Sequence, residues 1–138
     1  MVKKILVVDD DRDIVKVVQI NLEHAGYEVV TAYDGVEALE KVESDRPDMV
    51  ITDDRMPRMD GFELVKKLQE DDRFRDIPVI MLADGNQDAD IFKGWSLGVS
   101  GYYTKPFHPI EILVATERIF QSLESLKKPP PPDDSDKF

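Results

Sequence analysis

The sequence predicts an α/β protein in which helices cover both faces of a parallel β-sheet. Two observations lead to this fold class. Five short apolar runs rich in Val, Ile and Met alternate with longer amphipathic stretches, as buried strands alternate with crossover helices. The amphipathic stretches also begin with residues that cap helices. The 138 residues are enough for about one domain.

The apolar runs place the strands, and the amphipathic stretches between them place the helices. The runs are short enough for strands, whereas the stretches between them are long enough for helices of several turns. We expect strands at residues 3–9, 28–32, 48–53, 78–82 and 100–104. We expect helices at residues 12–25, 35–44, 61–71, 86–97 and 109–126.

Individual residues mark where the helices begin and end. Three carboxylates precede helices and can accept hydrogen bonds from first-turn N–H groups, namely Asp11, Asp34 and Asp60. Pro109 suits the first turn of the last helix, where a missing N–H has no consequence, and His108 stands at its N-cap. Gly26 and Gly98 follow the first and fourth helices, where a left-handed residue often ends a helix.

Composition and charge exclude several classes of protein. No apolar run approaches the roughly 18 residues of a membrane span. Eighteen basic and 29 acidic residues give a net charge of −11, which argues against direct nucleic-acid binding and suits a cation. The absence of cysteine excludes disulfides and thiolate metal sites and agrees with a reducing compartment, so we expect a cytoplasmic protein.

The composition changes near the C-terminus. Residues 127–138 contain four consecutive prolines and carry no net charge, so the acidic excess lies in residues 1–126. Proline lacks an N–H donor and favours an extended, solvated backbone. We therefore expect one domain at 1–126, followed by a disordered tail or part of a linker at 127–138.

Acidic residues gather where two of the expected strands end. The first strand finishes in Asp9, Asp10 and Asp11, and the third finishes in Asp53 and Asp54. If these strands are neighbours, the carboxylates converge at one edge of the sheet, where open parallel sheets bind ligands. Unit charges 4 Å apart repel by roughly 4 kcal/mol at an effective dielectric of 20. A hard divalent cation such as Mg²⁺ would relieve this repulsion.

A lysine completes the set of groups expected at this edge. Lys105 ends the fifth strand, and Pro106 restricts the backbone there and keeps the lysine at the rim. A metal, a carboxylate nucleophile and an ammonium group together suit phosphoryl transfer, which depends mainly on positioning and charge neutralisation.

With these residues in place, the sequence resembles the response-regulator receiver domains of two-component signalling, the CheY-like superfamily. The resemblance spans residues 3 to about 124 and rests on four segments in the family's order and spacing. The segments are Ile5–Asp11, Pro47–Gly61, Ile77–Leu82 and Gly98–Phe107. It implies a doubly wound (βα)5 flavodoxin-like fold, a three-layer sandwich with strand order 2-1-3-4-5.

The resemblance also implies a role for each site residue. Asp53 matches the phosphoryl acceptor, because Met-Pro and Asp-Gly follow it at the family's spacing. Asp9 and Asp10 match the Mg²⁺ carboxylates, and Arg55 matches the residue whose backbone carbonyl binds the metal. Lys105 matches the partner of the phosphoryl oxygens. Asp54 is then a neighbouring loop carboxylate, with the alternative that it faces the metal instead of Asp53.

The implied function is that of a signalling module in a phosphorelay. A sensor histidine kinase or phosphotransfer protein would donate a phosphoryl group to Asp53 in the presence of Mg²⁺. The chain would catalyse only its own phosphorylation and slow dephosphorylation, so it would not be an enzyme in the usual sense. We expect no membrane partner, and the downstream protein is not indicated by the sequence.

One departure from the family pattern concerns the end of the fourth strand. Receivers normally carry Thr or Ser there, whose hydroxyl bonds the phosphoryl group, whereas this chain has Ala83 followed by Asp84. Asp84 is either a loop or cap residue or a carboxylate that faces the phosphoryl group. Either phosphorylation at Asp53 persists with weaker switching, or the domain signals without phosphorylation. Tyr102 matches the family's switch aromatic, whose coupling depends on the missing hydroxyl.

The helix expected at 86–97 allows two interpretations of its apolar residues. Ile91 and Trp95 lie four residues apart and can pack into the core. Alternatively, they join Tyr102 on the surface of residues 86–97, 100–104 and 109–126, which binds partners or forms homodimers in the resembling family. A large aromatic side chain there would suit a binding hot spot.

The same residues allow two other functions. A receiver-like scaffold would bind its partner through the Trp95 surface irrespective of phosphate, and Ala83 favours it. A haloacid-dehalogenase-type phosphatase also uses an Asp nucleophile with Mg²⁺, but it needs an acid two residues later, where this chain has Arg55. His24 and His108 are isolated, and we expect neither to bind a metal or carry a phosphoryl group.

Overall fold

The computed structural model describes residues 2–85 and 88–127 and contains alternating strands and helices. The strands are β1 (Lys4–Val8), β2 (Glu28–Ala32), β3 (Met49–Asp53), β4 (Val79–Ala83) and β5 (Gly101–Thr104). The helices are α1 (Arg12–His24), α2 (Gly35–Asp45), α3 (Gly61–Glu70), α4 (Asp88–Ser96) and α5 (Pro109–Lys127). Each element falls within two residues of its predicted bounds.

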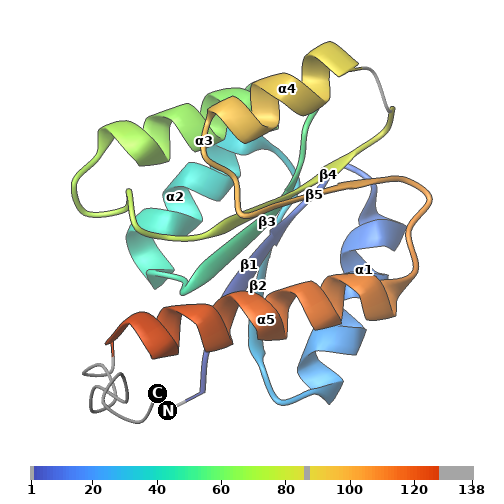
Figure 1. Ribbon diagram of the computed structural model, residues 1–138. Coiled ribbons are helices and arrows are strands. Elements are labelled where there is room, and N and C mark those ends of the chain that lie inside the picture. The colour runs from blue at the N-terminus through green and yellow to red at the C-terminus, as the bar shows by residue number, and fades with distance from the viewer. Residues whose placement is uncertain (1, 86–87, 128–138) are drawn as a thin grey trace, which may run out of the picture.

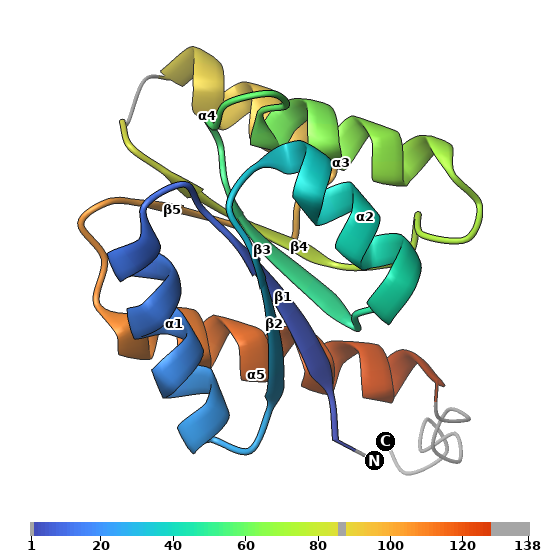
Figure 2. The same cartoon turned by 180° about the vertical axis from the view of Figure 1, so that it is seen from behind.

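The strands form one parallel sheet in the order β2-β1-β3-β4-β5, as predicted. Helices α1 and α5 cover one face, and α2, α3 and α4 cover the other (Figures 1 and 2). The order reverses between β1 and β3, which are neighbours although β2 lies between them in the sequence. This reversal is where ligands bind in such sheets.

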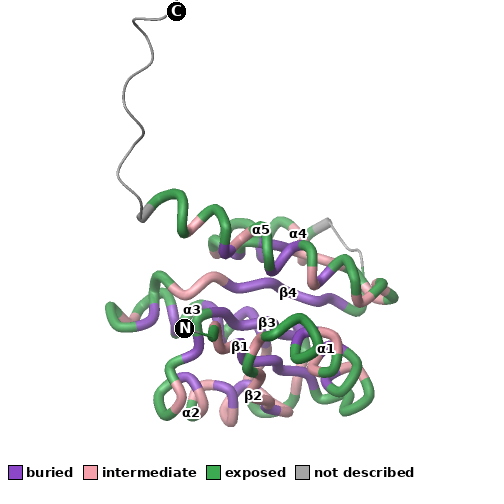
Figure 3. The backbone as a smooth tube through the Cα atoms, turned by 90° about the horizontal axis from the view of Figure 1, so that it is seen from below, coloured by how far each residue is buried: buried purple, intermediate pink, exposed green. Residues whose placement is uncertain are grey.

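The two faces of the sheet divide the apolar side chains by simple alternation. On β1, Leu6 and Val8 pack against α2 and α3, whereas Ile5 and Val7 pack against α1 and α5. The strands β3 and β4 alternate in the same way. Because both faces are covered, these strands are buried along almost their whole length, and Figure 3 shows the buried residues between the helix layers.

The predicted caps are present. Asp11, Asp34 and Asp60 each accept a hydrogen bond from a first-turn N–H of the helix that follows. The Nδ1 of His108 accepts a hydrogen bond from the Ile110 N–H at the start of α5. Gly26 and Gly98 have φ of 100° and 85°, the left-handed conformation expected of helix-ending glycines.

Two predictions reach beyond the described residues. The helix predicted from residue 86 is observed from Asp88, and residues 86–87 lie outside the description. The tail predicted at 127–138 also lies outside it, except that Lys127 is the last residue of α5. Within residues 2–85 and 88–127, no helix is both long enough and apolar enough to span a bilayer.

Candidate phosphoryl-transfer site

The sheet positions the site through backbone hydrogen bonds at the carboxyl ends of its strands. The Asp9 N–H donates to Ala32 O at 3.2 Å, and the Asp54 N–H donates to Leu82 O at 3.1 Å. The Lys105 N–H donates to Ala83 O at 2.7 Å, and the Lys105–Pro106 peptide bond is cis. Acidic and basic residues from three strand ends are therefore fixed along the same edge.

Lys105 is the centre of the ion pairs at this edge. Its Nζ lies 2.8 Å from Asp9 Oδ2, 3.4 Å from Asp53 Oδ1 and 3.2 Å from Asp84 Oδ1. Both Asp9 and Asp53 are almost completely buried, while the Asp84 side chain is 63% exposed. Asp84 therefore reaches into the site from its open side and is more than a loop carboxylate.

Asp53 is held so that one of its oxygens remains free. Its Oδ1 accepts a hydrogen bond from the Asp54 N–H at 2.9 Å, in addition to facing Lys105. Its Oδ2 is buried and has no hydrogen-bond partner in the structure. Gly61 is needed behind it, because any side chain at that position would overlap the Asp53 carbonyl. The backbone thus presents a carboxylate oxygen with a free lone pair.

The ionisation of these groups is strongly perturbed. Burial, together with the negative charge of Asp9, raises the pKa of Asp53 to about 8. Burial also raises the pKa of Asp9, although its hydrogen bond from Lys105 opposes that shift. Burial alone would lower the pKa of Lys105, but the hydrogen bond to Asp9 and the charge of Asp53 raise it, so the ammonium stays charged. A bound cation would favour the ionised form of Asp53.

Two groups of carboxylates at this edge have the spacing of metal ligands. One oxygen each of Asp9, Asp10 and Asp53 lie within 4.8 Å of one another, and so do one oxygen each of Asp53, Asp54 and Asp84. Oxygen ligands of this kind suit a hard divalent cation. The unpartnered Asp53 Oδ2 and the exposed Asp10 give the first group both a free ligand and access to water.

Asp54 differs from the loop carboxylate that we predicted. It is only 2% exposed, and its Oδ1 has no hydrogen-bond partner. Its carboxylate belongs to the second group, with Asp53 and Asp84. Burial, and after it the negative charge of Asp54, raises the pKa of Tyr102 to about 12. The sequence contained no signal of this burial, because the alternation of buried and exposed side chains along a strand is not reliable at the strand's end.

The structure also shows contacts that sequence reasoning missed. The exposed Arg55 guanidinium binds both carboxylate oxygens of Asp90 on α4, at 3.0 and 3.1 Å. Gly94 on α4 packs so closely on Tyr102 that an added Cβ would lie 2.8 Å from the ring. The Tyr102 hydroxyl is buried without a hydrogen-bond partner. Ala83 is fully buried at the end of β4.

The predicted partner surface is partly exposed. Trp95 is 51% exposed and Phe92, on the same helix, is 74% exposed, whereas Ile91 is half-buried. Core packing is therefore wrong for Trp95. The outer side of α4 instead presents two large aromatic side chains to solvent.

A doubly wound parallel sheet with acidic residues and a lysine at its carboxyl edge is the arrangement of a receiver domain, and comparison with known proteins agrees. Residues 5–117 match the family model of the response regulator receiver domain. This chain belongs to that family, whose members are signalling modules and not classical enzymes.

Curated relatives show the same membership. The alkaline phosphatase synthesis transcriptional regulatory protein PhoP of Bacillus subtilis is 42% identical over 124 residues, which cover 90% of this chain and 51% of the relative. The chemotaxis protein CheY1 of Helicobacter pylori is 42% identical over 108 residues, covering 77% of this chain and 87% of the relative. This chain spans about half the length of PhoP and of similar transcriptional regulators.

Solved structures support the fold. The chemotaxis response regulator CheY4 of Vibrio cholerae superimposes with a TM-score of 0.80 at 38% identity and covers 86% of this chain and 99% of its own. A CheY-like receiver domain protein from Methanospirillum hungatei gives a TM-score of 0.85 at 28% identity, covering 91% of this chain and 98% of its own.

Proposed function

We propose that the domain of residues 1–126 accepts a phosphoryl group on Asp53 from a sensor histidine kinase or phosphotransfer protein and transmits the signal to a protein partner. The observation that carries this proposal is the buried Asp53 carboxylate, whose Oδ2 is free while Lys105 lies 3.4 Å from its Oδ1. Membership of the receiver family supports it. The absence of cysteine supports a cytoplasmic setting.

The chemistry follows from the groups around Asp53. A carboxylate oxygen attacks the phosphorus of an N-phosphorylated imidazole, so that an O–P bond forms as the N–P bond breaks. The electron pair of the broken bond stays on the imidazole nitrogen, which leaves as neutral imidazole when its other nitrogen carries a proton. Lys105, whose Nζ lies 3.4 Å from Asp53 Oδ1, would stabilise the negative oxygens during transfer.

Mg²⁺ is the cofactor in this proposal. The carboxylates of Asp9, Asp10 and Asp53, with the backbone carbonyl of Arg55, would hold it. When bound, the ion supplies neutralisation of the phosphoryl charge. The three carboxylates have suitable spacing and chemistry, and the buried free oxygen of Asp53 provides one ligand.

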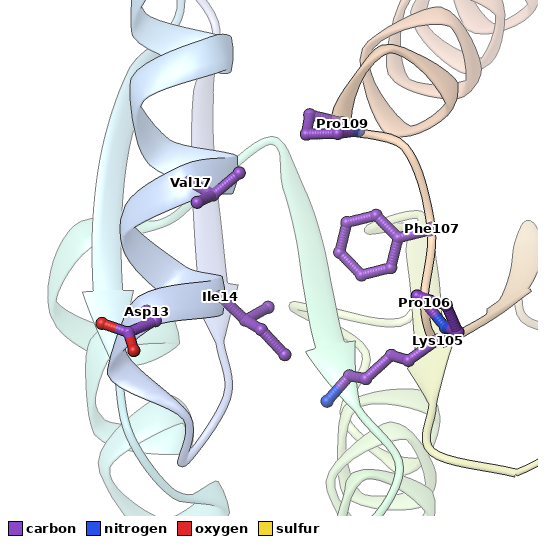
Figure 4. A pocket seen from close by; sticks show the side chains of 7 residues that line it. All are labelled: Asp13, Ile14, Val17, Lys105, Pro106, Phe107 and Pro109. Carbon is purple, nitrogen blue, oxygen red and sulfur yellow. The ribbon is translucent and has the colours of Figure 1, made fainter.

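The docking place that we propose for the phosphoryl donor is a cleft beside Lys105. A cleft of about 440 Å³ lies between α1 and the segment that joins β5 to α5 (Figure 4). Ile14 and Val17 point from α1 toward Phe107 and line it with apolar surface, and Val17 is 44% exposed. We propose that the donor protein packs an apolar surface here, which brings its phosphohistidine to the edge where Asp53 lies.

The signal leaves through the surface of α4, β5 and α5 in this proposal. Trp95 and Phe92 supply exposed aromatic area on α4, Ile91 lies beside them, and Tyr102 lies on β5 beneath Gly94. Aromatic side chains of this kind dominate binding energies at interfaces. We propose a second copy of the chain as one occupant. We also propose that this chain does not itself bind nucleic acid, in keeping with its charge of −11.

Intact mass spectrometry tests the acceptor directly. Incubation with Mg²⁺ and acetyl phosphate or phosphoramidate should add the mass of one phosphate. Asp53→Asn should add none, and Asp54→Asn should still add one, which separates the two neighbouring carboxylates. Phosphate uptake by Asp53→Asn, or none by the wild-type chain, would refute the proposal.

A second candidate function is a receiver-like scaffold that binds its partner irrespective of phosphate. The observation that favours it is Ala83, which is fully buried and has no hydroxyl to bond a phosphoryl group. The aromatic surface of α4 would then act without a switch. Unchanged NMR spectra of α4 and β5 on addition of Mg²⁺ and beryllofluoride would support the scaffold, and shifted spectra would support the phosphorylation switch.

A further inference from the structure

A second group of carboxylates lies beside the first, on the side of β4. One oxygen each of Asp53, Asp54 and Asp84 lie within 4.8 Å of one another. The sheet register creates this group, because Asp54 follows β3 and its N–H bonds to Leu82 O on β4. Asp84 follows β4 directly, where it reaches Lys105. This group therefore lies on the β4 side of Asp53, whereas the group with Asp9 and Asp10 lies on the β1 side.

Both buried members of this group, Asp53 and Asp54, have an unsatisfied carboxylate oxygen. Asp54 is 2% exposed, and its Oδ1 has no hydrogen-bond partner, just as Asp53 Oδ2 has none. A buried carboxylate oxygen without a donor is costly, because it has lost its water without replacement. Two buried oxygens in this state, on consecutive residues of one carboxylate group, favour a positively charged ligand at this place.

The charges at the edge agree with this indication. Asp9, Asp53 and Asp84 pair with Lys105, and Asp10 and Asp54 belong to the two carboxylate groups that these residues form. Within the described part of the chain, Lys105 makes every ion pair that these five carboxylates have. If all are ionised, the formal charge is −4, and a single divalent cation leaves −2. The neighbouring guanidinium of Arg55 is already bound by Asp90.

We propose that a second divalent cation binds between Asp53, Asp54 and Asp84, with Asp53 bridging it to the ion held by Asp9 and Asp10. The ligand set is entirely carboxylate oxygen, which suits Mg²⁺ or Mn²⁺. The exposed Asp84 provides access to water for the remaining ligands, and the buried Asp54 provides a fixed ligand. This proposal rests on the proposed function only through Asp53, which both sites share.

Mn²⁺ binding measured by room-temperature electron paramagnetic resonance, which counts the free ion, tests this proposal with the full chain. The wild-type chain should bind two Mn²⁺ ions. Asp84→Asn and Asp54→Asn should each lower the Mn²⁺ affinity of the second site by roughly 10- to 100-fold. This is the loss of affinity seen when even a residue that only supports a metal ligand is changed. Asp10→Asn should weaken the other site. Asp72→Asn, a carboxylate 89% exposed and distant in sequence, is the matched control and should bind two.

The outcomes distinguish this proposal from the proposed function. Binding of one ion, weakened by Asp10→Asn but not by Asp54→Asn or Asp84→Asn, would overturn the second site and leave the first intact. Binding of none would overturn both metal sites. Asp84 is mostly exposed, so its variant tests the site even if Asp54→Asn fails to fold. In Mn²⁺-soaked crystals, an anomalous peak between Asp54 and Asp84 should show the second ion, and a single peak beside Asp10 would contradict it.

Discussion

The carboxyl edge of the sheet has two sides that differ in construction. At the ends of β1 and β3, Asp9 and Asp53 are buried and are joined by Lys105. At the end of β4, Ala83 carries no polar group, and the α4 helix beside it presents Trp95 to solvent. The first side holds the charged groups of the proposed phosphoryl-transfer site, which we call the chemical side, and the second has a closely packed aromatic contact and an exposed surface. In the proposed function, phosphate acceptance and partner binding depend on different residues, so mutation should separate them.

The largest effect on stability is expected from removing the ammonium group of Lys105, at the ends of β1 and β3. Lys105→Met leaves Asp9 and Asp53 buried without their common partner, so the free energy of unfolding should fall by about 3 kcal/mol at pH 8 without divalent ions. Added Mg²⁺ should recover part of this loss. Urea unfolding measures it, with the exposed Lys16→Met as the control. Equal stability of the two variants would show that Lys105 does not compensate the buried acids.

The second largest effect is expected at Asp53, where a substitution should raise the stability of the metal-free protein. Burial and the Asp9 charge raise the pKa of Asp53 to about 8, so the folded protein holds this proton more tightly than the unfolded chain. Stability must then fall as pH rises from about 4 to about 8. Asp53→Asn removes this penalty and should stabilise the metal-free protein by about 1 to 3 kcal/mol at pH 8.

Melting temperatures measured from pH 5 to pH 9 in the presence of a chelator check the Asp53 prediction. The wild-type melting temperature should fall more steeply with pH than that of Asp53→Asn, and the two curves should approach each other near pH 5. Parallel curves across this range would contradict it. Asp71→Asn is a useful comparison because Arg73 lowers the pKa of Asp71 to about 2, and Asp71 stays ionised across this range.

The two sides also differ in how far the sequence could predict them. The chemical side follows from local patterns: apolar runs fixed β1 and β3, and acids directly after each run had to meet at one edge once the strands paired. The cap residues fixed most helix starts in the same local way. These features need only the period of a strand and the chemistry of a helix end.

The other side depends on contacts between distant residues, which local patterns do not contain. Arg55 and Asp90 are 35 residues apart, and their ion pair depends on where α4 packs. Exposure of Trp95 depends on the rotation of α4. On the first side, the burial of Asp54 was missed for a similar reason, because it depends on how the chain turns after β3. A helix as short as α4 has too few residues for its periodicity to decide which face is buried.

The packing of Tyr102 under α4 gives a third, smaller effect. Gly94→Ala places a Cβ 2.8 Å from the Tyr102 ring, so the ring or the helix must move, and stability should fall by about 1 to 2 kcal/mol. In a Tyr102→Ala background the same change meets no ring. It should then stabilise α4 by up to about 1 kcal/mol, because alanine favours a helix over glycine.

A double-mutant cycle in urea measures this coupling. The sign of the Gly94→Ala effect should reverse between the two backgrounds. The same sign in both would show that Tyr102 is not what limits position 94. The chemical side should be unaffected, so phosphate uptake by Gly94→Ala should match that of the wild-type chain.

The smallest effect on stability is expected at the exposed surface of α4, where the effect on the proposed dimerisation should be large. Trp95→Ala removes a side chain that is 51% exposed, so the free energy of unfolding should change by less than about 0.5 kcal/mol. If the α4 surface forms the proposed homodimer, sedimentation velocity with Mg²⁺ and beryllofluoride should show dimers of the wild-type chain and monomers of Trp95→Ala. The exposed Val2→Ala is the control and should still dimerise. Dimers that persist in Trp95→Ala would place the interface elsewhere, and dimers that form without beryllofluoride would mean that this surface acts independently of the chemistry at Asp53.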